Sequence, residues 1–311
     1  MRITALCPLL ALGLLGCAGL SSEEEQKLNS HKYNSKLWYE SGDFLRAEDQ
    51  CLKGLALERE DPSLNLLLGW TRLRQATYPK VVSAERIFTR ILDEELYLKN
   101  QGEARALLGL GSAQLWLATY FAERDPVESG RTSDLALRHL RDALRLAPDS
   151  FDTTQKMAEL HMLRGELEQA AEKLDLSLKE LSREAGILER QLALGGLPTE
   201  RTQALQARLE GNKARRVGIH LSKANLFYKL DRVDDGLHEL ELVEEIAPLP
   251  ANESFNRGRL LEKGGRLEEA LREYELFLRT TDRPLDDFVR EVIRRKAALE
   301  VRLERERTAG S

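Results

Sequence analysis

The most chemically specific position in this sequence is Cys17, which ends an apolar segment near the N-terminus. A cysteine thiolate is a strong nucleophile, so a cysteine in this place could accept a covalent group. Arg2 gives the segment a positive start, and residues 3–16 are almost wholly apolar. This order of charge, apolar core and small residues is typical of a secretory signal. As a helix, residues 3–20 would measure about 27 Å, which barely crosses a bilayer core, and their proline and glycines disfavour a permanent span.

Residues 14–17, Leu-Leu-Gly-Cys, resemble the lipobox of bacterial lipoproteins. The resemblance implies that the Cys17 thiol takes a diacylglyceryl group as a thioether. A peptidase would then remove residues 1–16, because small Gly16 fits its cleft, and the new amino group would receive an acyl chain such as palmitate. Two or three chains would give stable anchoring. In that family Asp after the cysteine favours the inner membrane, so Ala18 points to the inner leaflet of the outer membrane, facing the periplasm. An ordinary cleaved signal and an uncleaved anchor are the alternatives.

The mature N-terminus should then hold the protein close to the membrane. Residues 17–30 are interpreted as the lipidated cysteine followed by a polar tether. Cys51 would have no intrachain partner, and it lies among apolar residues at helical spacing. This setting favours a buried small hydrophobe, with a redox thiol as the alternative.

The composition favours helices and excludes some classes of protein. Charged residues make up 32% of the 311 residues, aromatic residues 6%, and there are only nine prolines. Such a chain is helix-forming. The mild net charge of −5 gives no case for nucleic-acid binding. After residue 20 no run of 18 apolar residues occurs, so no later segment is expected to span a membrane.

A repeat underlies the body of the chain. In four segments a turn at Gly or Asp leads into a new helix whose fifth residue is small, and these segments are residues 43–47, 166–170, 232–236 and 266–270. Ala136 and Ala170 are 34 residues apart, and so are Gly236 and Ala270. Apolar residues follow each small residue by four and seven positions, which is one face of a helix.

This pattern resembles the tetratricopeptide repeat family, in which pairs of antiparallel helices stack. The pairs Leu68-Gly69 and Leu108-Gly109 match the family's Leu-Gly, and Gly258 matches the same small position. The resemblance implies an all-α solenoid, assigned to residues 31–283, because one helix pair cannot bury its apolar face alone.

The departures from the period predict further features. An insertion around residues 120–133 is interpreted as a loop. Residues 174–230 are expected to form two long antiparallel helices, because leucines and Ala185 follow a heptad spacing there. Thr199 is the expected helix cap after the glycine break, and a degenerate repeat centred on Ala204 is the alternative. Residues 284–311 are predicted to form a capping helix with a polar outer face.

No residue pattern in this sequence indicates a specific catalytic chemistry. The sequence lacks a metalloprotease, serine-hydrolase or phosphate-loop motif. Its five histidines are scattered singly, so no metal site is predicted. We therefore expect no enzyme activity, no metal and no cofactor beyond the covalent lipid on Cys17. An enzyme would need a site assembled at the inserted loop.

Partners of this family usually lie in a concave groove lined by the first helix of each repeat. The groove positions implied here are Trp70, Asn225, Tyr228, Asn252, Phe255, Asn256, Arg259, Lys263 and Arg290. Asn225 and Asn256 match two asparagines with which some members grip a peptide C-terminus, but Leu221 and Asp286 replace the matching lysines. The known clamp is therefore broken, and ordinary surface is the alternative interpretation of these positions.

The sequence as a whole favours a membrane-anchored scaffold that binds cell-envelope proteins through its repeats. It resembles the tetratricopeptide lipoproteins that assist pilus secretins, outer-membrane protein assembly or cell-wall hydrolases, and nothing in the residues chooses among these. The alternative is a structural protein that self-assembles through the long hairpin. Contact with the membrane would be through the lipid anchor only.

Overall fold

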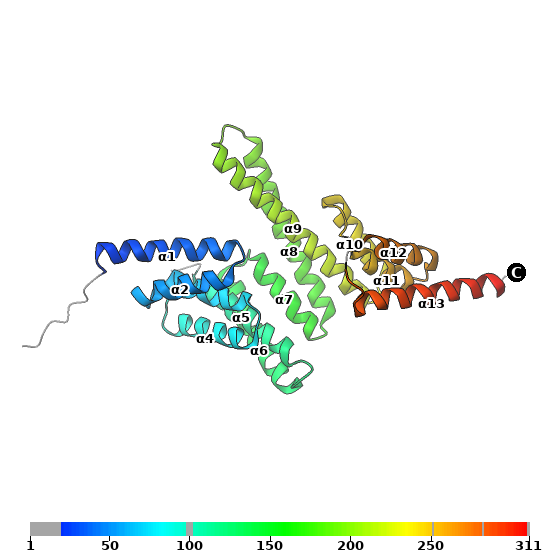
Figure 1. Cartoon of the computed structure of the whole chain (residues 1–311), viewed down its shortest axis with the longest axis horizontal. Helices are drawn as coiled ribbons and strands as arrows, with labels where there is room; N and C mark the ends of the chain where they lie inside the picture. Colours follow the sequence, from blue (N-terminus) through cyan, green and yellow to red (C-terminus); the bar gives the residue numbers. More distant parts are fainter. Residues whose placement is uncertain (1–19, 98–101, 251, 282, 310–311) are drawn as a thin grey trace, which may run out of the picture. The chain divides into compact units, whose positions relative to one another are not determined.

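The computed structural model describes residues 20–97, 102–250, 252–281 and 283–309. Within these ranges the chain is helical and contains no strand. It divides into two compact units, residues 1–113 and 114–311. The boundary falls within α5 (Gly102–Phe121), which is labelled in Figure 1. The predicted all-α repeat fold is confirmed. Cys17 and the rest of the predicted signal lie outside the described residues.

The first unit consists of helix pairs packed in chain order. They are α1 (Ser22–Glu40), α2 (Phe44–Leu57), α3 (Pro62–Arg74) and α4 (Tyr78–Asp93), followed by the first part of α5. Phe88 is fully buried, and a Cβ added at Gly69 would lie 2.7 Å from its ring. The Leu-Gly pair therefore leaves room for an aromatic ring between neighbouring helices.

Two predictions about this unit have different outcomes. Residues 22–30, expected to be a polar tether, are the start of α1. The side chains and backbone groups of Ser21 and Glu24 form a reciprocal capping box, and three glutamates in the first turn suit the positive end of the helix. The prediction of a buried Cys51 is confirmed, and burial raises the pKa of its thiol to about 12.

The second unit is also built from helices packed in chain order. It contains the end of α5 and α6 (Pro126–Leu146), α7 (Phe151–Leu163), α8 (Leu167–Ala193), α9 (Thr199–Lys229), α10 (Val233–Ile246), α11 (Glu253–Lys263), α12 (Leu267–Thr280) and α13 (Asp287–Ala309). The loop predicted at residues 120–133 is wrong, because Asp125 caps α6 and Pro126 is well suited to its first turn. The insertion lengthens α6 instead.

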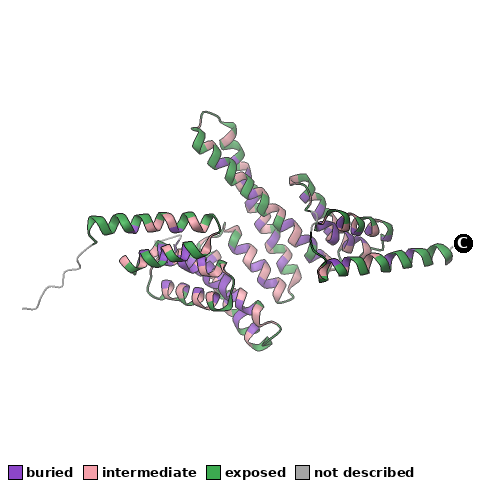
Figure 2. Ribbon diagram, viewed as in Figure 1, coloured by how far each residue is buried: buried purple, intermediate pink, exposed green. Residues whose placement is uncertain are grey.

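The long hairpin is present as α8 and α9, which pack against each other. Its predicted heptad residues Leu174, Leu181 and Leu188 are buried, and Figure 2 shows buried residues becoming sparse toward the turn. Gly195 and Gly196 adopt positive φ at that turn, which glycine allows without a Cβ penalty. Thr199 is the first residue of α9 rather than its cap, and α9 runs unbroken through the position of the alternative degenerate repeat.

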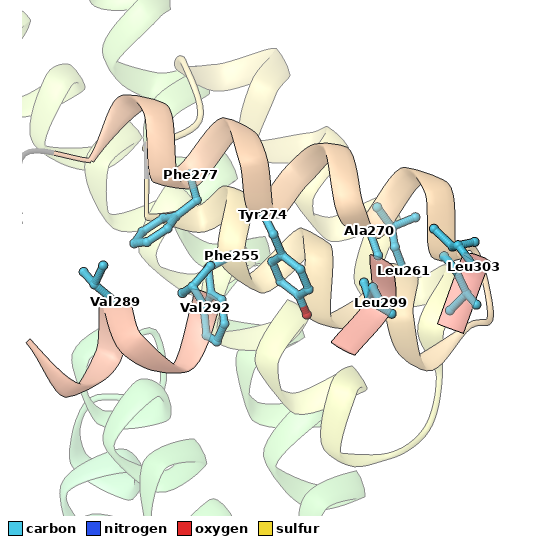
Figure 3. Packing of buried hydrophobic residues seen from close by; sticks show 10 residues of the cluster. Phe255, Leu261, Ala270, Tyr274, Phe277, Val289, Val292, Leu299 and Leu303 are labelled. Carbon is cyan, nitrogen blue, oxygen red and sulfur yellow. The ribbon is translucent and has the colours of Figure 1, made fainter. Parts of the chain in front are cut away.

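The C-terminal helix covers the end of the second unit as predicted. Figure 3 shows Val289 and Val292 of α13 beside Phe277 of α12 and Phe255 of α11. These residues belong to one buried cluster with Tyr274. The charged residues of α13 pair mainly along its own surface, as in Arg294 with Glu291 and Arg302 with Glu306. Among the described helices, none combines the length and apolarity needed to cross a membrane.

Candidate partner-binding surface

Small residues set the position of α11 against its neighbours. A Cβ added at Gly258 would lie 2.5 Å from the ring of Tyr274 on α12, and one added at Gly236 of α10 would lie 2.7 Å from Leu260 on α11. These close approaches fix α11 between α10 and α12. Arg259 and Lys263 are four residues apart, so they project from one face of α11, where α9 also comes close.

Four predicted groove residues meet at this place, and we call Tyr228, Phe255, Arg259 and Lys263 the Tyr228 patch. The Arg259 guanidinium carbon lies 4.0 Å from the ring centroid of Tyr228 and 5.6 Å from that of Phe255. Lys263 Nζ lies 4.8 Å from the Tyr228 centroid. Two cations therefore contact the Tyr228 ring, an arrangement that the negative face of an aromatic ring favours.

The two cations of the Tyr228 patch differ in their hydrogen-bond and ion-pair partners. Lys263 donates to the backbone oxygen of Tyr228 at 2.6 Å and pairs with Asp231 at 3.1 Å. Arg259 is half-buried and, among the described residues, has no carboxylate within ion-pair distance and makes no hydrogen bond. A guanidinium has five N–H donors, so Arg259 presents unused donors at a fixed position.

Phe255 is the buried member of the Tyr228 patch, so a partner could touch little of its ring. It is 6% exposed, and its ring packs edge-on against Phe288 of α13 with centroids 4.7 Å apart. The Arg283 guanidinium lies 4.8 Å from the Phe288 centroid. The Arg259 guanidinium therefore lies near a ring, Phe255, that is itself held in a buried aromatic cluster.

Within the described ranges, none of the remaining predicted groove residues of this unit places a cation over the Tyr228 ring. Asn252 and Asn256 both donate from Nδ2 to the buried Glu253, at 3.3 and 2.7 Å. Asn225 is exposed on α9. Arg290 is exposed on α13 and pairs with Asp287 at 3.3 Å. The structure therefore brings together four of the predicted residues, and the described contacts of Arg290 are with Asp287 rather than with those four.

Comparison with known proteins supplies the fold. No protein-family model matches the chain, and no curated protein matches it. Among solved structures, it resembles PilF of Pseudomonas aeruginosa, with 13% identity over 90% of this chain and 99% of that chain and a TM-score of 0.54. It also resembles a thermophilic TPR protein of Thermus thermophilus, with 18% identity over 77% and 98% of the two chains and a TM-score of 0.52.

The chain has a tetratricopeptide-type repeat fold. At these identities the likeness shows the fold alone. Within this TPR fold the small residues at positions such as Gly69 and Gly258 have the structural role that the repeat requires, since each lies against a buried aromatic ring.

Trp70, the predicted groove residue of the first unit, belongs largely to the core. It is half-buried and packs edge-on against Phe88 with centroids 5.5 Å apart. Its Nε1 atom is buried and has no hydrogen-bond partner among the described residues. Trp70 therefore contributes to packing between TPR helices rather than to an open groove.

Sequence patterns missed a buried ionic network beside the hairpin. His220 Nδ1 lies 2.6 Å from Glu239 Oε2, while Lys223 pairs with both Glu239 and Asp175. Burial opposes ionisation of Glu239, but the hydrogen bonds from His220 and Lys223 outweigh it, so the pKa of Glu239 is lowered. The network ties α8, α9 and α10 together. His220 is therefore a structural residue rather than a ligand-binding one.

A similar network lies in the first unit, where Glu48 accepts from Arg72, Gln75 and Lys80. In the part of the chain that the structure describes, no cluster of His, Cys, Asp and Glu could hold a metal ion. The sequence spacing of a Lys or Glu does not predict its ion-pair partners in these networks, because the partners come from other helices.

Proposed function

We propose that this protein is a lipid-anchored scaffold that holds another cell-envelope protein through the Tyr228 patch. The repeat fold supports the idea of a binding protein, because stacked helix pairs present extended surfaces to partners. The lipobox-like residues 14–17 support anchoring through Cys17, with the protein facing the periplasm from the outer membrane. The absence of a catalytic motif in the sequence fits a protein that works by holding others.

The observation that carries the binding proposal is the unpaired Arg259 on its aromatic base. Tyr228 and Phe255 fix the guanidinium, and the exposed Asn225 adds a polar group on the neighbouring helix. Aromatic and arginine side chains are the types that dominate binding energy at protein interfaces. The surface suits an extended segment of a partner, whose backbone would meet polar donors and whose side chains would meet the rings.

The proposal is tested by purification from the native host after crosslinking in cells. A partner bound at the Tyr228 patch should copurify with the wild type and be reduced by Tyr228→Ala and by Arg259→Glu. Arg279→Glu is the matched control, because Arg279 is exposed on α12 and lies outside the patch. Equal recovery of the partner from all four proteins would refute binding at the patch.

The same experiment distinguishes the envelope processes that the family resemblance suggests. A secretin, a component of outer-membrane protein assembly, or a cell-wall hydrolase among the crosslinked proteins would each assign the scaffold to its process. Anchoring is tested separately with Cys17→Ala, whose loss of signal cleavage or of membrane fractionation is the expected result.

A further inference from the structure

We infer that two copies of this protein associate through α13, with the two helices antiparallel and Ala297 of each copy at the two-fold axis. The inference does not depend on the Tyr228 patch. Figure 2 shows exposed residues recurring along α13. We call the exposed side of this helix, opposite its buried valines and leucines, the outer face. Its members are Arg290, Ile293, Arg294, Ala297, Glu300, Val301 and Glu304.

The outer face carries apolar side chains that a helix facing only water does not need. Ile293 is 44% exposed and Val301 is 52% exposed. They are separated by two steps of four residues with the exposed Ala297 between them, so the three lie along one stripe of the helix. The opposite side is already covered, because Val292 and Leu299 belong to the buried cluster shared with α11 and α12. A second molecule could therefore bury the stripe.

The charges of the outer face are arranged symmetrically about Ala297. Arg294 precedes it by three residues, and Glu300 follows it by three. Arg290 precedes it by seven residues, and Glu304 follows it by seven. The first half of the face is therefore positive and the second half negative. In two antiparallel copies centred on this residue, each arginine would lie opposite a glutamate of the other copy.

This symmetry favours a second copy of the chain over an unrelated partner. In a two-fold pair one surface has to be complementary to itself, and the outer face of α13 meets this condition. Ile293 and Val301 lie four residues on either side of Ala297, so they would also face each other across the pair. A parallel pair would place arginine opposite arginine, and such like charges disfavour it. The small central residue allows the two helices to approach closely.

The ion pairs within α13 are compatible with this association. Arg290 pairs with Asp287 at 3.3 Å, and Glu304 reaches Arg307 only at 4.0 Å. Exposed pairs of this kind contribute little to stability, and a guanidinium has donors for a second carboxylate. Asp287 and Arg307 lie ten residues on either side of Ala297, so they would face each other as well. Association would therefore join isolated ion pairs into a network, which is the arrangement in which surface charges contribute most.

The size of the contact indicates a reversible pair. The 23 residues of α13 form a helix about 34 Å long, and one such helix against another is a smaller interface than an obligate dimer uses. Attachment of both copies to one membrane, as proposed above, would raise their effective concentration and favour the pair. Covalent trapping is therefore the appropriate measurement.

Disulfide trapping in cells of the native host tests the association on the full-length protein. Ala297→Cys places a thiol at the two-fold axis, where the same position of two copies would meet. Arg279→Cys, at an exposed position of α12, measures disulfides that form by random collision. Leu194→Cys, at the 85% exposed end of α8, tests self-assembly through the hairpin. After brief treatment with a membrane-permeant oxidant, mass spectrometry identifies the linked positions, so disulfides of the protein's own cysteines are counted separately.

The expected result is a covalent dimer that depends on position along α13. Ala297→Cys should give about tenfold more dimer than Arg279→Cys, because the two axial positions are held together. When Ile293→Cys and Val301→Cys are expressed together, each should link to the other more than to itself, as an antiparallel pair requires.

Charge reversal tests whether the arginines and glutamates face each other. Arg290→Glu should reduce the dimer formed by Ala297→Cys by about tenfold, because it replaces two attractive contacts with repulsive ones. Adding Glu304→Arg to the same chain should restore the dimer, since the exchanged charges are again complementary. A loss of helix structure could not produce this recovery.

Four results would overturn the inference. Equal amounts of dimer from Ala297→Cys and Arg279→Cys would contradict association through α13. More dimer from Leu194→Cys would place the contact between copies at the hairpin, and a disulfide between Ala297→Cys and a different protein would assign the outer face to that partner. Preferential linkage of Ile293→Cys to itself, or no recovery on adding Glu304→Arg, would contradict the antiparallel, charge-matched arrangement.

Discussion

Gly258 should be one of the positions at which the repeat tolerates no side chain. A Cβ there would lie 2.5 and 2.7 Å from two ring carbons of Tyr274, which is fully buried and whose hydroxyl donates to Glu262 at 2.6 Å. Overpacking of this kind costs about 1–3 kcal/mol. Loss of the hydroxyl's hydrogen bond adds about 1 kcal/mol, and the better helix propensity of alanine offsets about 1 kcal/mol. Gly258→Ala should therefore destabilise the protein by about 1–3 kcal/mol.

Gly218 is the matched control for Gly258. It is also a helical glycine, but a Cβ added there meets nothing within 4 Å. Gly218→Ala should therefore stabilise the protein by about 0.5–1 kcal/mol, since only the helix propensity changes. The two substitutions are chemically identical and should move the stability in opposite directions.

Urea unfolding followed by circular dichroism measures both effects. For a loss of about 1–3 kcal/mol and a typical urea dependence, the midpoint for Gly258→Ala should fall by about 0.5–1.5 M. Combining Gly258→Ala with Tyr274→Leu should show coupling, because the smaller side chain removes the clash. If both alanine variants shifted the midpoint in the same direction, or if no coupling appeared, the account of close packing at Gly258 would be wrong.

Three further predictions concern other parts of the chain. The pKa of Glu239 in the folded protein lies below its ordinary value of 4.5, so Glu239 should contribute stability that is present above about pH 4.5 and lost as the pH falls through the folded pKa. Urea unfolding measured across this pH range should show a smaller loss of stability in Glu239→Gln than in the wild type. Asn212, which donates to the Leu181 backbone oxygen at 2.9 Å and to Glu184 at 3.0 Å, should hold the hairpin together, so Asn212→Ala should speed hydrogen exchange in residues 181–215 while α12 stays protected. Cys17→Ala should shift the protein from the membrane to the soluble fraction, and unchanged fractionation would argue against a lipid anchor.

The sequence was most informative where a small residue and an apolar stripe recur at a fixed spacing. Ala170, Gly236 and Ala270 predicted the helix pairs, because close packing restricts such positions to small residues. The long hairpin was likewise predicted from leucines at heptad spacing, since a seam between two helices requires this order. These are local constraints, and one chain is enough to show them.

Two segments were predicted incorrectly, because a polar stretch and a break in the repeat spacing were each taken to mean irregular structure. The glutamates at residues 23–25 are polar, yet they stabilise the first turn of α1. Residues 120–133 broke the repeat spacing, yet Asp125 and Pro126 form a helix start. In both cases a capping side chain accepts a hydrogen bond from the first turn and stabilises a helix where a loop was expected.

The candidate site could be predicted only in part. Helical position placed Arg259 and Lys263 on one face, but their distances to Tyr228 depend on how α9 and α11 pack. The pairing of Arg290 with Asp287 and the binding of two asparagines to Glu253 could not be inferred, because helical spacing does not choose between neighbouring partners. The unpaired state of Arg259 becomes visible only when its spatial neighbours are known.

Site-specific photocrosslinking in living cells tests the central claim most directly. A photoreactive residue at Asn225, which is exposed on α9, should form a covalent adduct with one envelope protein, and Arg259→Gln should reduce that adduct. The same residue placed at Arg279 on α12 should not form it. An adduct that is equally abundant from both positions, or that persists unchanged in Arg259→Gln, would contradict a scaffold that holds its partner at the Tyr228 patch.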